Sequence, residues 1–131
     1  MARAGEPVML PEQRVAVGEG MVNISVDLPR GGAIDAAVPF RVTYRSGNTE
    51  IIRLIPKVSG QTFSRPVFPI SIPATFAVGR TTVEIEVSFR WKPGGRRGRS
   101  RLVQAVVPVE VAREAAEKDV AALIVLSASD S

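Results

Sequence analysis

Alternating apolar and polar residues are the main pattern along this chain. Successive side chains of a β-strand point to opposite faces, so a period of two predicts strands with one buried face. Residues 21–28 follow this period, with an apolar side chain at every even-numbered position. Residues 39–44 repeat it and lead into the turn-forming sequence Ser46-Gly-Asn48, after which the apolar run 51–55 predicts a further strand.

A longer pair of alternating segments predicts an antiparallel hairpin. Residues 81–91 and 101–111 match in length and are rich in β-branched side chains, and the nine residues 92–100 join them. Burial of each large apolar side chain contributes roughly 1.5–3 kcal/mol before conformational entropy is counted. The side chains predicted to face the core are Val83, Ile85, Val87, Phe89 and Trp91 in the first strand and Val103, Ala105, Val107, Val109 and Val111 in the second.

The remaining segments are less regular. Prolines interrupt residues 57–80, and because proline cannot donate to a sheet ladder, this segment belongs at an edge or in an extended connection. Residues 112–119 favour a short helix or a turn, and residues 120–126 favour a last strand.

Together these segments predict an all-β fold. We expect an immunoglobulin-like antiparallel β-sandwich of seven or eight strands, with at most one short helix near residues 112–119. Residues 1–12 are expected to form an extended N-terminal segment, residues 13–126 a single β-sandwich domain, and residues 127–131 a disordered tail.

Composition narrows the possible chemistry. The 131 residues are 45% hydrophobic, which is enough for one domain with its own core. The chain has neither cysteine nor histidine, which excludes disulfides, thiolate zinc sites, cysteine nucleophiles and Ser-His-Asp triads. An enzyme would have to rely on carboxylates and hydroxyls, so we expect no enzyme, no cofactor and no metal site.

Nothing in the sequence predicts contact with a membrane. The longest apolar run, residues 120–126, is far shorter than the ~20 residues of a transmembrane helix. The first residues lack the apolar stretch of a secretory signal. We therefore expect a soluble protein, and the sequence leaves its compartment open.

Positive charge is concentrated in one segment. The chain has 17 lysines and arginines and 13 acidic residues, a net charge of +4. Without the six cations between residues 90 and 101, eleven positive and thirteen negative charges would remain. We predict that this segment contacts an anion or a partner, and its cations are Arg90, Lys92, Arg96, Arg97, Arg99 and Arg101.

Two interpretations of this basic segment remain open. Guanidinium groups match phosphate oxygens, and the glycines would let the backbone approach a nucleic acid or another polyanion. Alternatively, the charges form a solvated hairpin tip that hinders aggregation, and this is the interpretation we favour. Trp91 could stack on a base, but it continues the apolar face of the strand and is expected in the core. Glu84 and Glu86 share a strand face, although no further metal ligand is suggested beside them.

Two stretches of the sequence resemble a known family. The glycine-led strand from Val15 that ends in Leu28-Pro-Arg-Gly31, and the hairpin closed by Val107-Pro-Val109, resemble the C-terminal β-sandwich domain of thioredoxin-like NHL-repeat proteins. The immunoglobulin-like N-terminal domain of thiol:disulfide interchange proteins has a similar outline. Members often have a cysteine pair near this hairpin, where this chain has Trp91, Lys92 and Ser100, so no redox role is carried over. The resemblance implies a non-catalytic sandwich that packs against other domains.

From these observations we expect a non-catalytic accessory or protein-interaction domain, part of a larger protein. Exposed strand edges and loops would bind a protein partner or a neighbouring domain, with residues 65–73 and 92–101 as the expected contacts. The alternative is a domain that binds nucleic acid or another anionic ligand through the basic hairpin loop 90–101.

Overall fold

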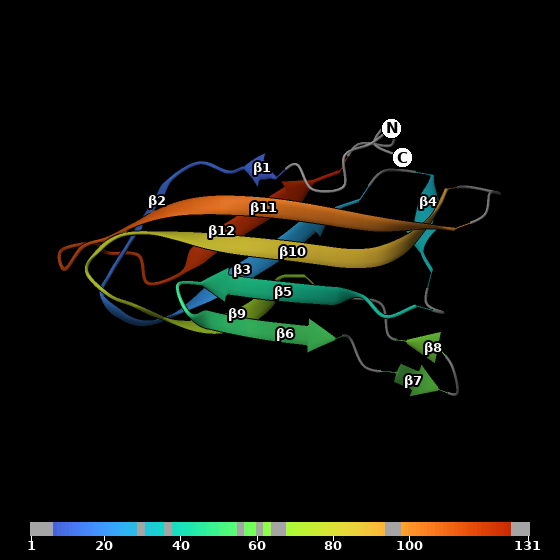
Figure 1. Cartoon of the computed structure of the whole chain (residues 1–131), viewed down its shortest axis with the longest axis horizontal. Coiled ribbons are helices and arrows are strands. Elements are labelled where there is room, and N and C mark those ends of the chain that lie inside the picture. Colours follow the sequence, from blue (N-terminus) through green and yellow to red (C-terminus); the bar gives the residue numbers. More distant parts are fainter. Residues whose placement is uncertain are drawn as a thin grey trace.

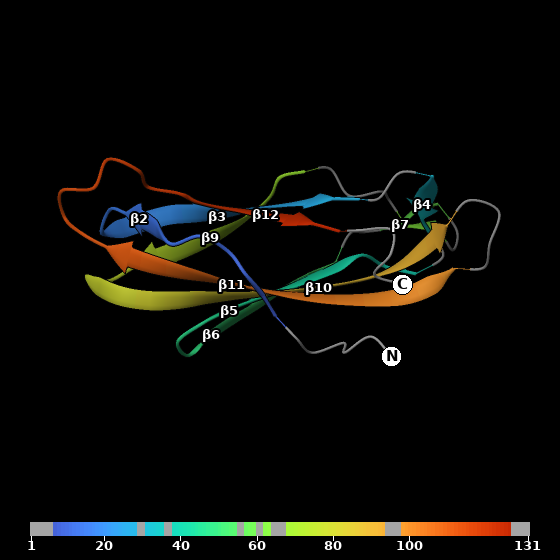
Figure 2. The same cartoon turned by 90° about the horizontal axis from the view of Figure 1, so that it is seen from above.

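Two facing β-sheets make up most of the protein in the computed structural model, which describes residues 7–28, 31–35, 38–54, 57–59, 62–63, 68–93 and 98–126 (Figures 1 and 2). No helix in these ranges is long and apolar enough to cross a membrane. The strands are β1 (Val8–Met9), β2 (Gln13–Val15), β3 (Gly18–Asp27), β4 (Gly32–Ile34), β5 (Arg41–Ser46), β6 (Thr49–Leu54), β7 (Lys57–Ser59), β8 (Thr62–Phe63), β9 (Ile70–Phe76), β10 (Gly79–Pro93), β11 (Arg99–Val111) and β12 (Val120–Val125).

The larger sheet is built around the long β10–β11 hairpin. Its strand order is β1-β11-β10-β5-β6, with β2 also beside β11 and β4 also beside β10. The smaller sheet has the order β12-β3-β9 and forms the second layer in Figure 2. A separate two-stranded sheet pairs β7 with β8.

This strand order is that of an immunoglobulin-like sandwich with one change. In that fold, strands G, F, C and C′ lie side by side in one sheet, and strands A, B and E lie in the other. Here β11, β10, β5 and β6 take the first set of places, while β3 and β9 take those of B and E. The place of strand A beside β3 is filled by β12, which pairs with β3 in parallel, while β2 stays with β11.

The predicted all-β sandwich is confirmed, and seven of the strands are at least six residues long. The sheets are mixed rather than purely antiparallel, because β1, β2 and β12 each pair in parallel. The predicted loop 92–100 is shorter than expected: β10 continues to Pro93 because β4 pairs with residues 91–93. Residues 112–119 contain a turn and no helix, and the predicted last strand follows them as β12.

The predicted domain is bounded by residues 13 and 126. The sheet begins before residue 13, because Val8 and Met9 pair with β11 from within the segment expected to be merely extended. The predicted tail, residues 127–131, lies outside the described residues. The proline-containing strand β9 is at an edge of the smaller sheet, as expected.

The core lies between the two sheets and contains the predicted faces of the hairpin. Val83, Ile85, Val87, Phe89 and Trp91 are all buried. Phe89 stacks on Phe40 with ring centroids 5.3 Å apart. Near the hairpin tip the indole of Trp91 packs so closely on Gly32 that an added Cβ would lie 2.5 Å from its ring.

Replacing Phe89 should test how strongly the hairpin is tied to the second sheet. Phe89→Ala leaves a cavity beside Phe40, and we expect the free energy of unfolding to fall by about 3–5 kcal/mol in a urea titration. Leu102→Ala is the control, because Leu102 is 39% exposed on the outer face of β11 and should change stability by less than about 1 kcal/mol. Equal losses in both variants would contradict the assignment of the inner face.

Candidate functional site

The predicted basic segment divides between the two faces of the hairpin rather than forming one loop. Arg90 and Lys92 lie on the outer face of β10. Arg99 lies opposite Trp91, and Arg101 lies opposite Phe89, so both arginines are on the face of the hairpin that carries the buried aromatic side chains. At this end of the hairpin that face reaches solvent, since Arg99 is exposed and Arg101 is half-buried. The two other predicted cations, Arg96 and Arg97, lie outside the described residues.

Arg90 is engaged in contacts within the protein. Its Nε lies 3.5 Å from Oδ2 of Asp35, which follows β4, and its Nη2 donates to the carbonyl oxygen of Gly98 at 3.4 Å. Gly98 packs against the same side chain, since an added Cβ would lie 2.8 Å from the Arg90 Nε. These contacts tie β10 to Gly98, just before β11, and to Asp35, just after β4, so Arg90 is less available to a ligand than its neighbours.

The remaining cations of this end are free of intramolecular ion pairs. Among the described residues, Lys92, Arg99 and Arg101 form none, and neither does Arg41. Arg41 lies opposite Ser88 on β5 and shares the outer face with Arg90. Sequence reasoning missed Arg41, because only the pairing of β5 with β10 brings it to this end. We call Arg41, Arg90, Lys92, Arg99 and Arg101 the basic end.

Elsewhere in the described part of the chain, arginines are mostly paired with acids. Arg14 contacts Glu110 and Glu114, and Arg80 contacts Glu12. At the β5–β6 hairpin, the side-chain hydrogen bond from Arg45 to Glu50 raises the pKa of Arg45 above its usual value. Charge is therefore balanced over the body of the domain and unbalanced at the basic end.

Two other predicted candidates resolve into structural roles. Trp91 is only 5% exposed, so it belongs to the core, and the base-stacking alternative is wrong. Glu86 accepts a hydrogen bond from the Gln104 amide on β11. Within the described ranges, no three histidine, cysteine, aspartate or glutamate side chains gather where they could hold a metal ion.

A second candidate surface, which the sequence did not single out, is the free edge of β12. The strand is apolar on both faces: Ala122 and Ile124 are buried, while Leu123 is 56% and Val125 63% exposed. It is also the outermost strand of the smaller sheet. An exposed edge strand of this kind can pair with another chain, and proteins commonly protect such edges with charge or proline.

One side chain protects part of this edge. The Gln13 amide group, on β2, donates to the carbonyl oxygen of Ala121 and accepts from its N–H at 2.9 Å. Backbone groups alternate in direction along a strand, so those of Leu123 and Val125 point the same way as those of Ala121, away from β3. No backbone partner on that side is present for these two residues within the described chain.

The opposite edge of the smaller sheet is blocked differently. Pro73 lies in the middle of β9 and has no N–H to offer to an added strand. The predicted partner contact 65–73 is therefore a poor acceptor of a strand where it is described, and residues 65–67 lie outside the described ranges. Of the two edges, that of β12 is the open one.

Comparison with known proteins finds no family model that matches this chain and no curated protein that matches its sequence. The suggested resemblance to the sandwich domain of NHL-repeat proteins therefore stays a prediction. The features of the domain that bear on its function are therefore the basic end and the free edge of β12.

The Gln13 contact can be tested directly. Gln13→Ala removes both hydrogen bonds to Ala121, and we expect a loss of about 1–2 kcal/mol in unfolding free energy and faster hydrogen exchange at the Ala121 amide. Gln104→Ala, which removes a partly buried side-chain hydrogen bond in the larger sheet, serves as the control and should leave the Ala121 amide protected. Unchanged Ala121 exchange in the Gln13 variant would show that the clamp does not hold this edge.

Proposed function

We propose that the chain is a non-catalytic protein-interaction domain that binds by strand addition at the edge of β12, and that the strand it receives is β12 of a second copy. The observation that carries the proposal is the open backbone at Leu123 and Val125, on a strand with apolar side chains on both faces. Main-chain hydrogen bonds supply affinity in this mode of recognition, and side chains on the two faces supply specificity.

The symmetry of the open edge favours a second copy. Leu123 and Val125 lie on either side of Ile124, and a two-fold axis through Ile124 would place Leu123 opposite Val125 of the other copy. Directly opposed residues of an antiparallel pair can exchange two hydrogen bonds, so the two symmetric pairs would satisfy all the open groups of both residues.

The side chains of the edge are also self-complementary. No charged residue occurs within β12, so antiparallel pairing opposes only apolar side chains. The exposed side chains of Leu123 and Val125 would cover each other on the outer face. A charged partner strand would bring an unpaired charge to this surface, which is costly when desolvated.

Self-association of the purified domain tests the proposal. We expect a monomer–dimer equilibrium in sedimentation velocity, with the dimer fraction rising with protein concentration. Val125→Pro should abolish the dimer, because proline removes an outward N–H while leaving the exposed edge apolar, and the parallel pairing with β3 does not use that N–H. Leu123→Lys should abolish it as well, since an edge lysine disfavours strand addition.

Val78→Lys provides the matched control for the lysine variant. Val78 is 59% exposed in the connection between β9 and β10, so the change in charge and exposure is similar, and the dimer should persist. A domain that stays monomeric at all concentrations would overturn the proposal. A dimer that tolerates Val125→Pro would also overturn it, by placing the contact elsewhere.

The basic end supports a second candidate function, the binding of a nucleic acid or another polyanion. Arg41, Lys92, Arg99 and Arg101 lack acidic partners among the described residues, while Arg90 contacts Asp35 and Gly98 at the same end. Lysine and arginine side chains that neutralise phosphates displace counterions from the polyanion, so the logarithm of the affinity falls linearly with the logarithm of the salt concentration.

A salt titration with fluorescent DNA, RNA and heparin tests this candidate. One triple variant changes Lys92, Arg99 and Arg101 to Ser. In this variant the slope of log affinity against log salt should become shallower by about 1 for each phosphate that is no longer neutralised. The control changes Arg53, Arg80 and Arg113 to Ser, which removes the same charge from other exposed positions. The absence of binding at low salt, or an equal effect of both variants, would eliminate a specific role of the basic end.

A further inference from the structure

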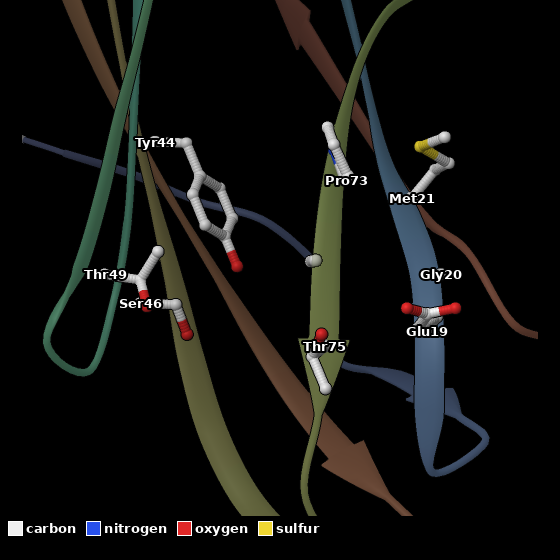
Figure 3. Close-up of a pocket in the computed structure, with 9 residues that line it drawn as sticks. Glu19, Gly20, Met21, Tyr44, Ser46, Thr49, Pro73 and Thr75 are labelled. Carbon is white, nitrogen blue, oxygen red and sulfur yellow. The ribbon is translucent and has the colours of Figure 1, made fainter.

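A pocket opens between the two sheets beside the β5–β6 turn. Its volume is about 560 Å³, within the range of small-molecule sites. Four strands line it: β3 and β9 from the smaller sheet and β5 and β6 from the larger one (Figure 3). Its lining residues are Glu19, Gly20, Met21, Tyr44, Ser46, Thr49, Pro73, Ala74 and Thr75.

Tyr44 is the residue that points to a ligand. Its side chain comes from the middle of β5 and is only 3% exposed, yet its hydroxyl is directed into the pocket (Figure 3). The hydroxyl makes no hydrogen bond with any described residue. Because the hydroxyl opens into the pocket, it can both donate a hydrogen bond to a molecule there and accept one from it.

The other polar groups of the pocket are of matching chemistry. Ser46 and Thr49 lie on the same side as Tyr44, and Thr75 lies across from them on β9 (Figure 3). Each hydroxyl can both donate and accept a hydrogen bond, as the hydroxyls of a ligand can. Pro73 and Ala74 add an apolar wall, which suits the C–H groups of a small ring.

The charge of the lining disfavours anionic ligands. Among the described residues that line the pocket, Glu19 is the only charged one, and none is a lysine or an arginine. An anionic ligand would be repelled by the Glu19 carboxylate and would find no cation to pair with. A neutral ligand can donate hydroxyl hydrogens to that carboxylate instead.

We propose that this pocket binds a neutral, hydroxyl-rich small molecule of the sugar or polyol class, with the Tyr44 hydroxyl as a central hydrogen-bonding group. The site is independent of the interaction surfaces described above. In Figure 1 the β5–β6 turn lies toward the other end of the long axis from β4, which pairs with the end of β10, and no residue of β12 lines the pocket.

An NMR titration of the isotope-labelled domain tests the proposal. The probes are glucose, galactose, mannose, N-acetylglucosamine and their common disaccharides, with glucuronate as the anionic counterpart. We expect at least one neutral sugar to shift the backbone amides of Gly20, Ser46 and Ala74 in a saturable way. Glucuronate should bind more weakly than glucose, because its carboxylate would face Glu19.

Tyr44→Phe isolates the hydroxyl, since the ring that packs in the core is retained. Loss of one hydrogen bond predicts about a fivefold weaker affinity for the sugar that binds. Thr75→Val, at an exposed position of the lining, should weaken binding to a similar or smaller extent without affecting the core. Thr82→Val, which removes an exposed hydroxyl from β10 outside the pocket, should leave the affinity unchanged.

Three results would overturn the proposal. The first is that no neutral sugar shifts the lining amides at any accessible concentration. The second is that Tyr44→Phe, with its fold intact by the spectrum, binds as tightly as the parent domain. The third is that glucuronate binds more tightly than glucose, which would show that the lining does not select against negative charge.

Discussion

The register of the β10–β11 hairpin is the constraint on which the rest of the structure depends. The two strands stay in register without a bulge from the Gly79–Val111 pair to the Trp91–Arg99 pair. A shift of one residue between them would put the apolar side chains of the two strands on opposite faces, so either the side of Phe89 or that of Val107 would turn toward solvent. Because β2, β4 and β5 all pair with this hairpin, the same register fixes where the basic end and the β5–β6 turn lie relative to each other.

The sequence predicted which face of each strand is buried better than it predicted which strands pair with each other. The period of two identified the buried side of β3, β5, β10 and β11, because that pattern follows from the pleat of each strand alone. It could not predict that β12 would take the place beside β3, or that Gln13 would contact Ala121, 108 positions later. The pocket at Tyr44 was missed for the same reason: four strands build it, and within its own strand Tyr44 looks like any core residue.

The proposed activities use three physically different parts of one sandwich. The basic end gathers cations that the body of the domain leaves unbalanced, the edge of β12 has no charge at all, and the Tyr44 pocket has a single carboxylate among hydroxyls. If the proposals hold, each surface binds a ligand of different chemistry, and none requires a side chain from the others. A rigid sandwich can hold separate contacts at fixed positions, which the proposed interaction role would require.

The pairing of β12 with β3 has a consequence for folding during synthesis, because β12 follows all the other described strands in the chain. Every other long strand has been synthesised once residue 111 is reached, yet one side of β3 is still bare at that moment. Without β12, the smaller sheet would consist of β3 and β9 alone, and Val22 and Ile24 would lack the neighbouring residues of β12. The smaller sheet can be completed only after residues 120–125 have left the exit tunnel, and a chaperone that shields apolar strands could act before then.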